Sequence, residues 1–128
     1  MKPTSQYPQA VPNHQKSSMS DDTLIISAEF IQRLAILTRK LGYVFNDLSL
    51  PKLALTHRSF DSKKNYERLE FLGDALLGMI VGEALYHRYP TQNEGRLTRM
   101  RATLVRQESL VIIAQNLELS NQLILGVG

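Results

Sequence analysis

The stretch 65–87, NYERLEFLGDALLGMIVGEALYH, constrains the fold of this chain more than any other. It contains no proline, and beyond Asp74 it is apolar on nearly every side. Asn65 is a residue type that caps helices, and Pro90 cannot continue one. The stretch therefore predicts one long helix that ends near His87. A helix that is apolar all round is expected to be buried against other helices.

The rest of the chain also has helical periodicity, and no region alternates polar and apolar residues as a half-buried strand does. Ser27, Asn93 and either Asn46 or Asp47 are candidate helix caps, and Gly42 is a candidate stop. The further helices that we expect cover about 27–41, 47–55, 94–104 and 106–117. The predicted fold class is all-α, with one helical domain over residues 26–128.

Residues 1–25 are rich in Pro, Ser, Gln and Asn and contain few large apolar groups. Such a composition buries too little surface to offset the entropy of ordering, so we expect a disordered tail. The tail has no apolar core and hence does not resemble a secretory signal. Met19 lies within it and is an alternative start to Met1.

Composition narrows the class of protein. Hydrophobic residues make up 43% of the chain, enough for a core, and the formal net charge is +3, a mild hint of an anionic partner. The sequence has no cysteine, which excludes a disulfide framework and suits a reducing compartment. No stretch reaches the roughly 18 apolar residues of a membrane helix. We expect a cytoplasmic protein with no membrane contact.

Three carboxylates share one face of the long predicted helix. At about 100° per residue, Glu67, Glu70 and Asp74 fall within roughly 60° of one another. Anions placed so close together repel unless a cation lies between them, and oxygen ligands suit Mg²⁺. The alternative is a solvated helix start, where the helix dipole favours acidic residues. That alternative accounts for Glu67 but not for Asp74.

Gly73 lies in the middle of the same helix, where glycine costs about 1 kcal/mol relative to alanine. Either tight helix packing or the approach of another group to the backbone would explain it.

The segment ERLEFLGDALL, residues 67–77, resembles the signature motif of the ribonuclease III family. LTHRSF at 55–60 and NEGRLTRMRATLVR at 93–106 resemble two further blocks of that family, in its order and at its spacing. The likeness extends from about Leu34 to Gly128 and is closest to the bacterial enzymes that cut double-stranded RNA.

The resemblance implies an all-helical endonuclease domain that forms a homodimer. It makes Asp74 the catalytic aspartate and a metal ligand, and Glu70 the second metal ligand. Glu67 and Glu94 match acidic residues of the same cleft. Phe71 matches an aromatic residue that docks into the partner subunit; its alternative is an ordinary core residue. His57 of the THRS block is expected to be structural.

The same resemblance implies the reaction. Mg²⁺, with Mn²⁺ as a substitute, would be held by Glu70 and Asp74 and would assist hydrolysis of a phosphodiester. The products would carry 5′-phosphate and 3′-hydroxyl ends, and the substrates would be ribosomal-RNA precursors and other structured RNAs.

Four arginines form a basic run, and either a solvated helix face or contact with RNA phosphates would explain them. We assign phosphate contact to Arg96 and Arg99 in preference to Arg101 and Arg106.

The family also uses an aspartate and a glutamate that follow the part matching LGVG, and a C-terminal domain that binds double-stranded RNA. The printed sequence ends at Gly128, before either. We therefore expect it to be a fragment with little or no activity alone. The competing function is a non-catalytic dimeric RNA-binding scaffold, but such relatives usually lose the acidic residues, which are intact here.

Overall fold

The computed structural model describes residues 26–127, and this part of the chain is helical. Its elements are α1 (Ala28–Leu41), α2 (Ser49–Leu55), α3 (Glu67–Arg88), α4 (Glu94–Val105), α5 (Gln107–Asn116) and the short 3-10 helix η1 (Leu119–Asn121). The all-α prediction is confirmed. The predicted tail over 1–25 and the alternative start at Met19 lie outside the described residues.

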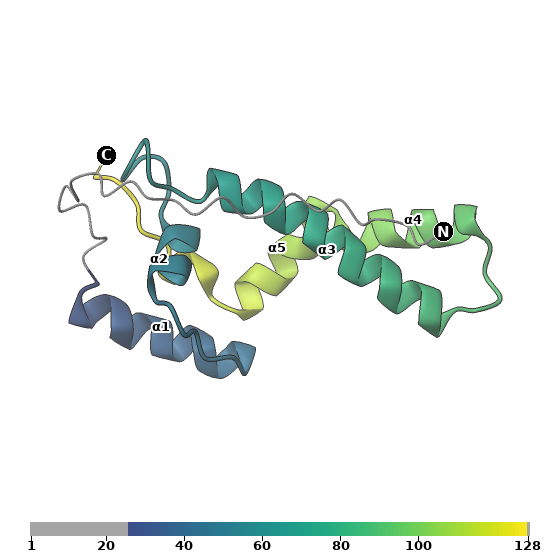
Figure 1. Ribbon diagram of the computed structural model, residues 1–128, viewed down its shortest axis with the longest axis horizontal. Coiled ribbons are helices and arrows are strands. Elements are labelled where there is room, and N and C mark those ends of the chain that lie inside the picture. The colour runs from purple at the N-terminus through teal and green to yellow at the C-terminus, as the bar shows by residue number, and fades with distance from the viewer. Residues whose placement is uncertain (1–25, 128) are drawn as a thin grey trace, which may run out of the picture.

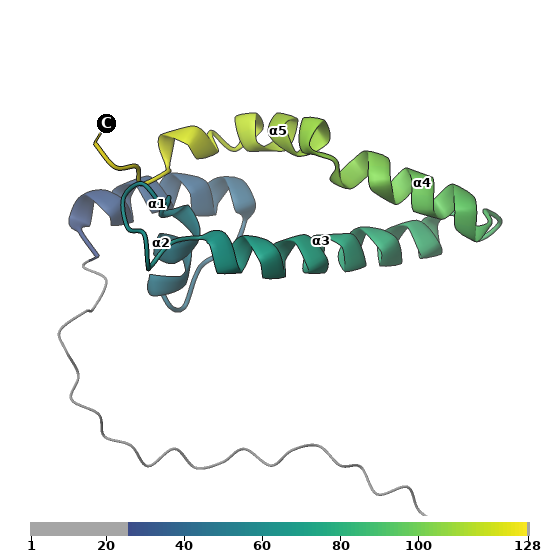
Figure 2. The ribbon, with the colours of Figure 1, turned by 90° about the horizontal axis from the view of Figure 1, so that it is seen from above.

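The helices form an elongated arrangement (Figures 1 and 2). α3 runs along one side, and α4 returns beside its far half, so that α4 and α5 in succession lie opposite α3. α1, α2 and the start of α3 gather at one end, where the chain also finishes. The acidic start of α3 therefore lies beside the packed end of the molecule.

The core lies at that same end. Its buried side chains are Phe30, Leu34 and Leu37 of α1 and Leu55 of α2. Partly buried apolar groups from distant parts of the sequence pack around them: Ile26, Phe45, Leu48, Leu117, Leu119, Leu123 and Ile124. The spacing of three or four residues along α1 is what places its apolar groups on one face.

The predicted caps of α1 and α4 are present. The Ser27 hydroxyl accepts a hydrogen bond from the amide of Phe30 at 3.1 Å, and the Asn93 side chain accepts one from Arg96 at 2.9 Å. Gly42 ends α1 with a φ of 64°, in the left-handed region that glycine adopts most easily. Local cap chemistry therefore sets these helix ends.

Asp47 and Asn65 were predicted to cap α2 and α3, but each helix begins one residue later than a cap at that residue would place it. The Asp47 carboxylate accepts hydrogen bonds from the amide and hydroxyl of Ser49, at 2.9 and 2.6 Å. These bonds lower the pKa of Asp47, because they favour its charged form. The Asn65 side chain similarly accepts from the amide of Glu67 at 3.0 Å. Asp47 and Asn65 therefore each accept a hydrogen bond from the first amide of a helix, but each lies one residue before the N-cap position.

The last described segment, 122–127, crosses back over the loop between α2 and α3. Ile124 forms a parallel bridge with Thr56: its amide donates to the Leu55 carbonyl at 2.8 Å, and its carbonyl accepts from His57 at 2.9 Å. The amide of Gly126 donates to the Ser59 hydroxyl at 2.9 Å. We call this segment the C-terminal strap. Its apolar sequence did not predict these contacts.

The long helix differs from expectation in its burial. α3 was expected to be buried, yet among the described residues Leu85 is its one fully buried side chain. Its exposed large apolar groups are Phe71, Leu72, Leu76, Met79, Ile80 and Tyr86. The reason is geometric: α4 packs against the far half of α3, and the helices lie along one side of it only. No helix of the described part is long and apolar enough to cross a membrane.

Candidate active site on the acidic face of α3

The three predicted carboxylates lie in the first turns of α3. Glu67, Glu70 and Asp74 are all exposed to solvent, and the intervals of three and four residues put them on one face of the helix. We call these residues the acidic face. Residues on neighbouring elements determine how the acidic face is positioned and which ligands it can bind.

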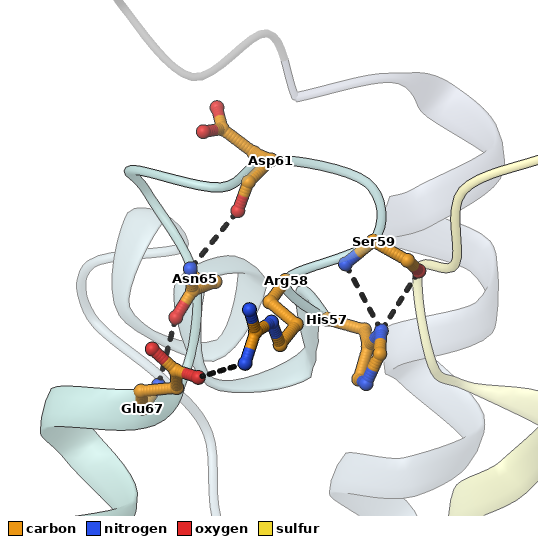
Figure 3. Close-up of polar contacts among 6 residues, drawn as sticks. All are labelled: His57, Arg58, Ser59, Asp61, Asn65 and Glu67. Atoms are coloured by element: carbon orange, nitrogen blue, oxygen red, sulfur yellow. Dashed lines mark hydrogen bonds and ion pairs between the residues drawn. The ribbon is translucent and has the colours of Figure 1, made fainter.

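The loop that precedes α3 fixes the start of the acidic face (Figure 3). The Asn65 side chain is nearly buried, and while its oxygen caps α3 its nitrogen donates to the Asp61 carbonyl at 3.0 Å. The amide of Tyr66 donates to the Thr56 carbonyl at 3.0 Å, and Thr56 is the most buried polar residue described. The direction of α3 is therefore set by buried hydrogen bonds.

Two charged groups of the same loop complete this network. Arg58 lies 3.6 Å from the carboxylate of Glu67, a pair that is largely exposed and so contributes little stability by itself. The Asp61 carboxylate accepts from the amides of Lys64 and Lys63, each at 2.9 Å. These backbone hydrogen bonds lower the pKa of Asp61, with the lysine charges adding to the effect.

A hollow of about 770 Å³ opens beside the acidic face. Glu67 lines it together with three cationic side chains, Lys63, Lys64 and Arg68. Phe71, which is 82% exposed, stands at the same hollow. One carboxylate among three cations is an arrangement that favours a polyanion.

Glu94 does not join the acidic face within one chain. It starts α4, its carboxylate accepts from the Thr98 hydroxyl at 2.9 Å, and it lines a separate hollow with Gly82 and Tyr86. A helical rise of about 1.5 Å per residue separates Gly82 from Glu67 by roughly 22 Å. Within one chain Glu67 and Glu94 therefore line different hollows, because α4 runs antiparallel to α3, and their place in one cleft stays a prediction.

The basic run divides among different surroundings. Arg96 and Arg99 line a third hollow of about 470 Å³ with Tyr89 and apolar groups of α3 and α4. Arg101 instead lies across Gly82 of α3, where a Cβ atom would stand 3.5 Å from its guanidinium. Arg106 lies 4.0 Å from Glu108. Arg96 and Arg99 thus line one hollow, while Arg101 and Arg106 lie elsewhere, and contact of Arg96 and Arg99 with RNA phosphates stays a prediction.

Gly73 has open space around it. Within the described part of the chain, nothing beyond the helix lies within 4 Å of the place where a Cβ would stand. The tight-packing explanation for this glycine is therefore wrong for the described residues, because α4 packs on α3 further along.

The acidic face fits a divalent cation only in part. Among residues 26–127, no group of three or more His, Asp or Glu side chains is placed to hold a metal ion. Glu70 and Asp74 nevertheless offer two exposed carboxylates one turn apart. Mg²⁺ commonly takes one or two carboxylates and completes its octahedron with waters and substrate phosphate. The donor type and number therefore suit Mg²⁺.

Sequence reasoning missed several residues that hold this site. Arg58, Ser59 and Asp61 contact partners that lie within the loop, on α3 or on the C-terminal strap. The contacts of Asp61 could have been predicted, because an aspartate commonly forms a turn by accepting hydrogen bonds from amides two and three residues later in the chain. The contacts of Arg58 and Ser59 depend on how separate segments meet in the fold, and no pattern in the sequence indicated them.

The sequence matches a family profile described as Ribonuclease-III-like over residues 47–128. The chain belongs to the ribonuclease III family. It is 94% identical to Ribonuclease 3 of Psychrobacter arcticus over 128 residues, all of this chain and 48% of that protein. It is 65% identical to Ribonuclease 3 of Acinetobacter pittii over 92 residues, 72% of this chain and 40% of that one. The chain thus spans about half the length of these relatives.

A solved structure has the same fold. The nuclease domain of ribonuclease III from Campylobacter jejuni aligns with a TM-score of 0.71 at 43% identity, covering 75% of this chain and 65% of that one. A second structure of that nuclease domain is 44% identical in sequence, and its description reports structural flexibility in a region involved in dimer formation. The predicted family membership is confirmed.

Proposed function

We propose that this chain is part of a cytoplasmic, metal-dependent endoribonuclease that cuts double-stranded RNA and acts as a homodimer. The observation that carries the proposal is the acidic face: exposed carboxylates on a helix whose start is fixed by buried hydrogen bonds. The match to the ribonuclease III family supports it. Relatives that carry the name Ribonuclease 3 support the reaction class. The similar nuclease domain from Campylobacter jejuni, described as having a region involved in dimer formation, supports the dimer.

The carboxylates of Glu70 and Asp74 would hold Mg²⁺, with Mn²⁺ as a substitute. The bound ion would supply a water of lowered pKa and positive charge at the phosphate, giving 5′-phosphate and 3′-hydroxyl ends. Asp74 would be the catalytic aspartate through this contact. Glu67, held by Arg58, would maintain negative potential beside the pair.

Cationic side chains would bind the RNA backbone. Lys63, Lys64 and Arg68 lie around the hollow at the acidic face, and Arg96 and Arg99 lie together further along the molecule. A duplex laid along α3 would contact both groups in succession. Binding through phosphates weakens as salt rises. Precursors of ribosomal RNA and other structured RNAs are the substrates that we propose.

A second copy of the chain would complete the site. Within one chain Glu94 and Glu67 line different hollows. Phe71 is 82% exposed beside that face, and burial of a phenylalanine against a partner is strongly favourable. We infer that dimerisation covers Phe71 and brings Glu94 of one copy toward the acidic face of the other.

The test is cleavage of long duplex RNA by the protein. Asp74→Asn should retain RNA binding and reduce the cleavage rate by at least about a hundredfold, because the loss of metal-ion catalysis is worth several kcal/mol. Glu29→Gln is the matched control, since Glu29 is an exposed glutamate at the start of α1. Its cleavage rate should be unchanged.

The same assay separates the enzyme from the scaffold. A scaffold binds duplex RNA in the wild type but cuts none at any Mg²⁺ or Mn²⁺ concentration. Cleavage that survives in Asp74→Asn would remove Asp74 from the mechanism.

A further inference from the structure

Thr56 lies where α2, the loop before α3 and the C-terminal strap meet, and it is 1% exposed. Its hydroxyl donates a hydrogen bond to the Lys52 carbonyl of α2 at 2.7 Å. Its carbonyl accepts one from the amide of Tyr66, directly before α3, at 3.0 Å. It also forms the parallel bridge with Ile124 of the strap. One buried residue therefore connects three segments of the molecule.

The hydroxyl of Thr56 determines how α2 ends. The amide of Thr56 donates to the Leu53 carbonyl at 3.2 Å, three residues back, and the hydroxyl takes the place of an amide at the Lys52 carbonyl, four residues back. Because its amide has left the α-helical pattern, Thr56 adopts an extended backbone with a φ of -86° and a ψ of 117°. Its carbonyl is thereby available to the amide of Tyr66 instead of continuing α2.

The start of α3 depends on such hydrogen bonds because little packing holds it. Among the described residues, the core contains no side chain of α3. α4 packs against the far half of α3, and residues 71–76 of the near half are all exposed. Leu53 of α2 and Leu69 of α3 line the same hollow, so open space lies between these two helices. At its acidic end, α3 is therefore joined to the core through the loop and its hydrogen bonds.

The placement of α3 relative to this loop matters for the candidate site. Glu70 and Asp74 belong to α3, whereas the amides of Lys63 and Lys64 are held in the loop by the Asp61 carboxylate. Carboxylates that bind a metal ion and cations that bind phosphate must face one phosphodiester at the same time. The two groups meet only if the angle between the loop and α3 is fixed.

We propose that Thr56 is a positioning residue for the acidic face: it fixes the end of α2 and the start of α3 at one buried point, and so holds the carboxylates of α3 in place relative to the cationic loop. Without the hydroxyl, the nearest donor for the Lys52 carbonyl is the amide of residue 56. That exchange extends α2 and turns the carbonyl of residue 56 away from Tyr66. The consequence for RNA cleavage rests on the proposed function, whereas the placement of α3 does not.

The test measures the distance between α1 and α3 in the wild type and in Thr56→Val, which exchanges the hydroxyl for a methyl group. The chain has no cysteine, so Gln32→Cys on α1 and Ala75→Cys on α3 supply unique attachment points for two spin labels. Both positions are exposed. Electron paramagnetic resonance of labelled protein, mixed with an excess of unlabelled protein, gives distances within one chain. The distribution of distances should be broader in Thr56→Val than in the wild type.

Two further variants test whether the hydroxyl is responsible. Thr56→Ser retains the hydroxyl and should give the wild-type distribution. Thr38→Val is the matched control, because the Thr38 hydroxyl also donates to a carbonyl of its own helix, that of Ala35 at 3.0 Å, but from an exposed position on α1. It should leave the distribution unchanged. A Thr56→Val distribution as narrow as that of the wild type, or a Thr56→Ser distribution as broad as that of Thr56→Val, would overturn the proposal.

Cleavage of duplex RNA by the same variants measures the consequence for the site. Thr56→Val should lower the maximal rate by about tenfold, because small displacements of catalytic groups are costly. The Mg²⁺ concentration that gives half the maximal rate should be unchanged, because Glu70 and Asp74 remain one turn apart on α3. A wild-type rate in Thr56→Val would overturn the positioning role. A wild type that cuts no RNA would overturn the proposed function, and the distances would still test Thr56.

The donor to the Thr56 carbonyl offers a second test if Thr56→Val does not fold. Tyr66→Pro removes that amide hydrogen, and the φ of -76° at Tyr66 is one that proline adopts. Tyr66→Ala removes the ring but keeps the amide. The distance distribution should broaden in Tyr66→Pro and should keep its wild-type width in Tyr66→Ala. Equal widths in these two variants would refute the role assigned to Thr56.

Discussion

The side-chain oxygen of Asn65 accepts a hydrogen bond from the amide of Glu67 at 3.0 Å, while its nitrogen donates to the Asp61 carbonyl at the same distance. One nearly buried amide thus joins the loop to the first residue of the acidic face. Both hydrogen bonds are lost if the side chain is truncated.

Asn65→Ala should lower the free energy of unfolding by about 2 kcal/mol, because it removes two part-buried hydrogen bonds, one of which caps α3. Asn93→Ala is the matched control: it removes the cap of α4 from an exposed position and should cost about 1 kcal/mol. Urea denaturation of both variants gives the comparison. Equal losses would mean that the bond to Asp61 contributes nothing.

Gly126→Ala should loosen the C-terminal strap. A Cβ at this position would stand 2.2 Å from the Ser59 carbonyl oxygen, so the backbone must shift, at a cost of about 1–3 kcal/mol. Gly78→Ala is the control, since nothing lies within 4 Å of its Cβ position. A helical Gly→Ala change in open space should stabilise by about 0.5–1 kcal/mol. Thermal denaturation should shift the two variants in opposite directions.

Features that depend on neighbouring residues could be predicted from the sequence. Ser27, Gly42 and Asn93 end or begin helices through groups three to five residues away, and the helix bounds accordingly agree within about a residue or two. The acidic face is equally local, because a helix of known pitch fixes the positions of Glu67 and Asp74 on its surface.

Features that depend on distant segments could not be predicted. Nothing in QLILGVG indicates that Ile124 would pair with Thr56, because the pairing arises when the segment after η1 packs against the core at the end of α2. The separation of Glu94 from the acidic face follows from the antiparallel course of α4. The apolar pattern of α3 predicted burial, but no pattern within the helix shows that Phe71 would be exposed.

Phe71→Ala should weaken the homodimer that we propose. Loss of a phenylalanine from the centre of an interface typically costs about 2 kcal/mol or more, which raises the dissociation constant at least about thirtyfold. Tyr86→Ala is the matched control, an aromatic residue of α3 that is 68% exposed at the opposite end. Sedimentation of the protein over a concentration series measures both dissociation constants. An unchanged dissociation constant for Phe71→Ala would place the interface elsewhere.

The ion pair between Lys40 of α1 and Glu118 predicts a dependence of stability on pH. Lys40 donates to the Glu118 carboxylate and to the Asn116 carbonyl, the latter at 3.4 Å, and so ties α1 to the end of α5. The hydrogen bond and then the charge of Lys40 lower the pKa of Glu118. A carboxyl whose pKa is lower in the folded state stabilises that state above its unfolded pKa.

Glu118→Gln should therefore reduce stability slightly at neutral pH. The difference from the wild type should shrink as the pH falls below about 4.3, the ordinary pKa of a glutamate, and should vanish once the pH is below the lowered pKa of Glu118 in the folded state. The effect should be small and should diminish at high salt, because the pair is partly exposed. Urea denaturation at neutral and acid pH measures it, with Glu29→Gln as a control that leaves the link between α1 and α5 intact. A difference that persists at acid pH would show that Glu118 acts through its packing or its left-handed backbone instead of its charge.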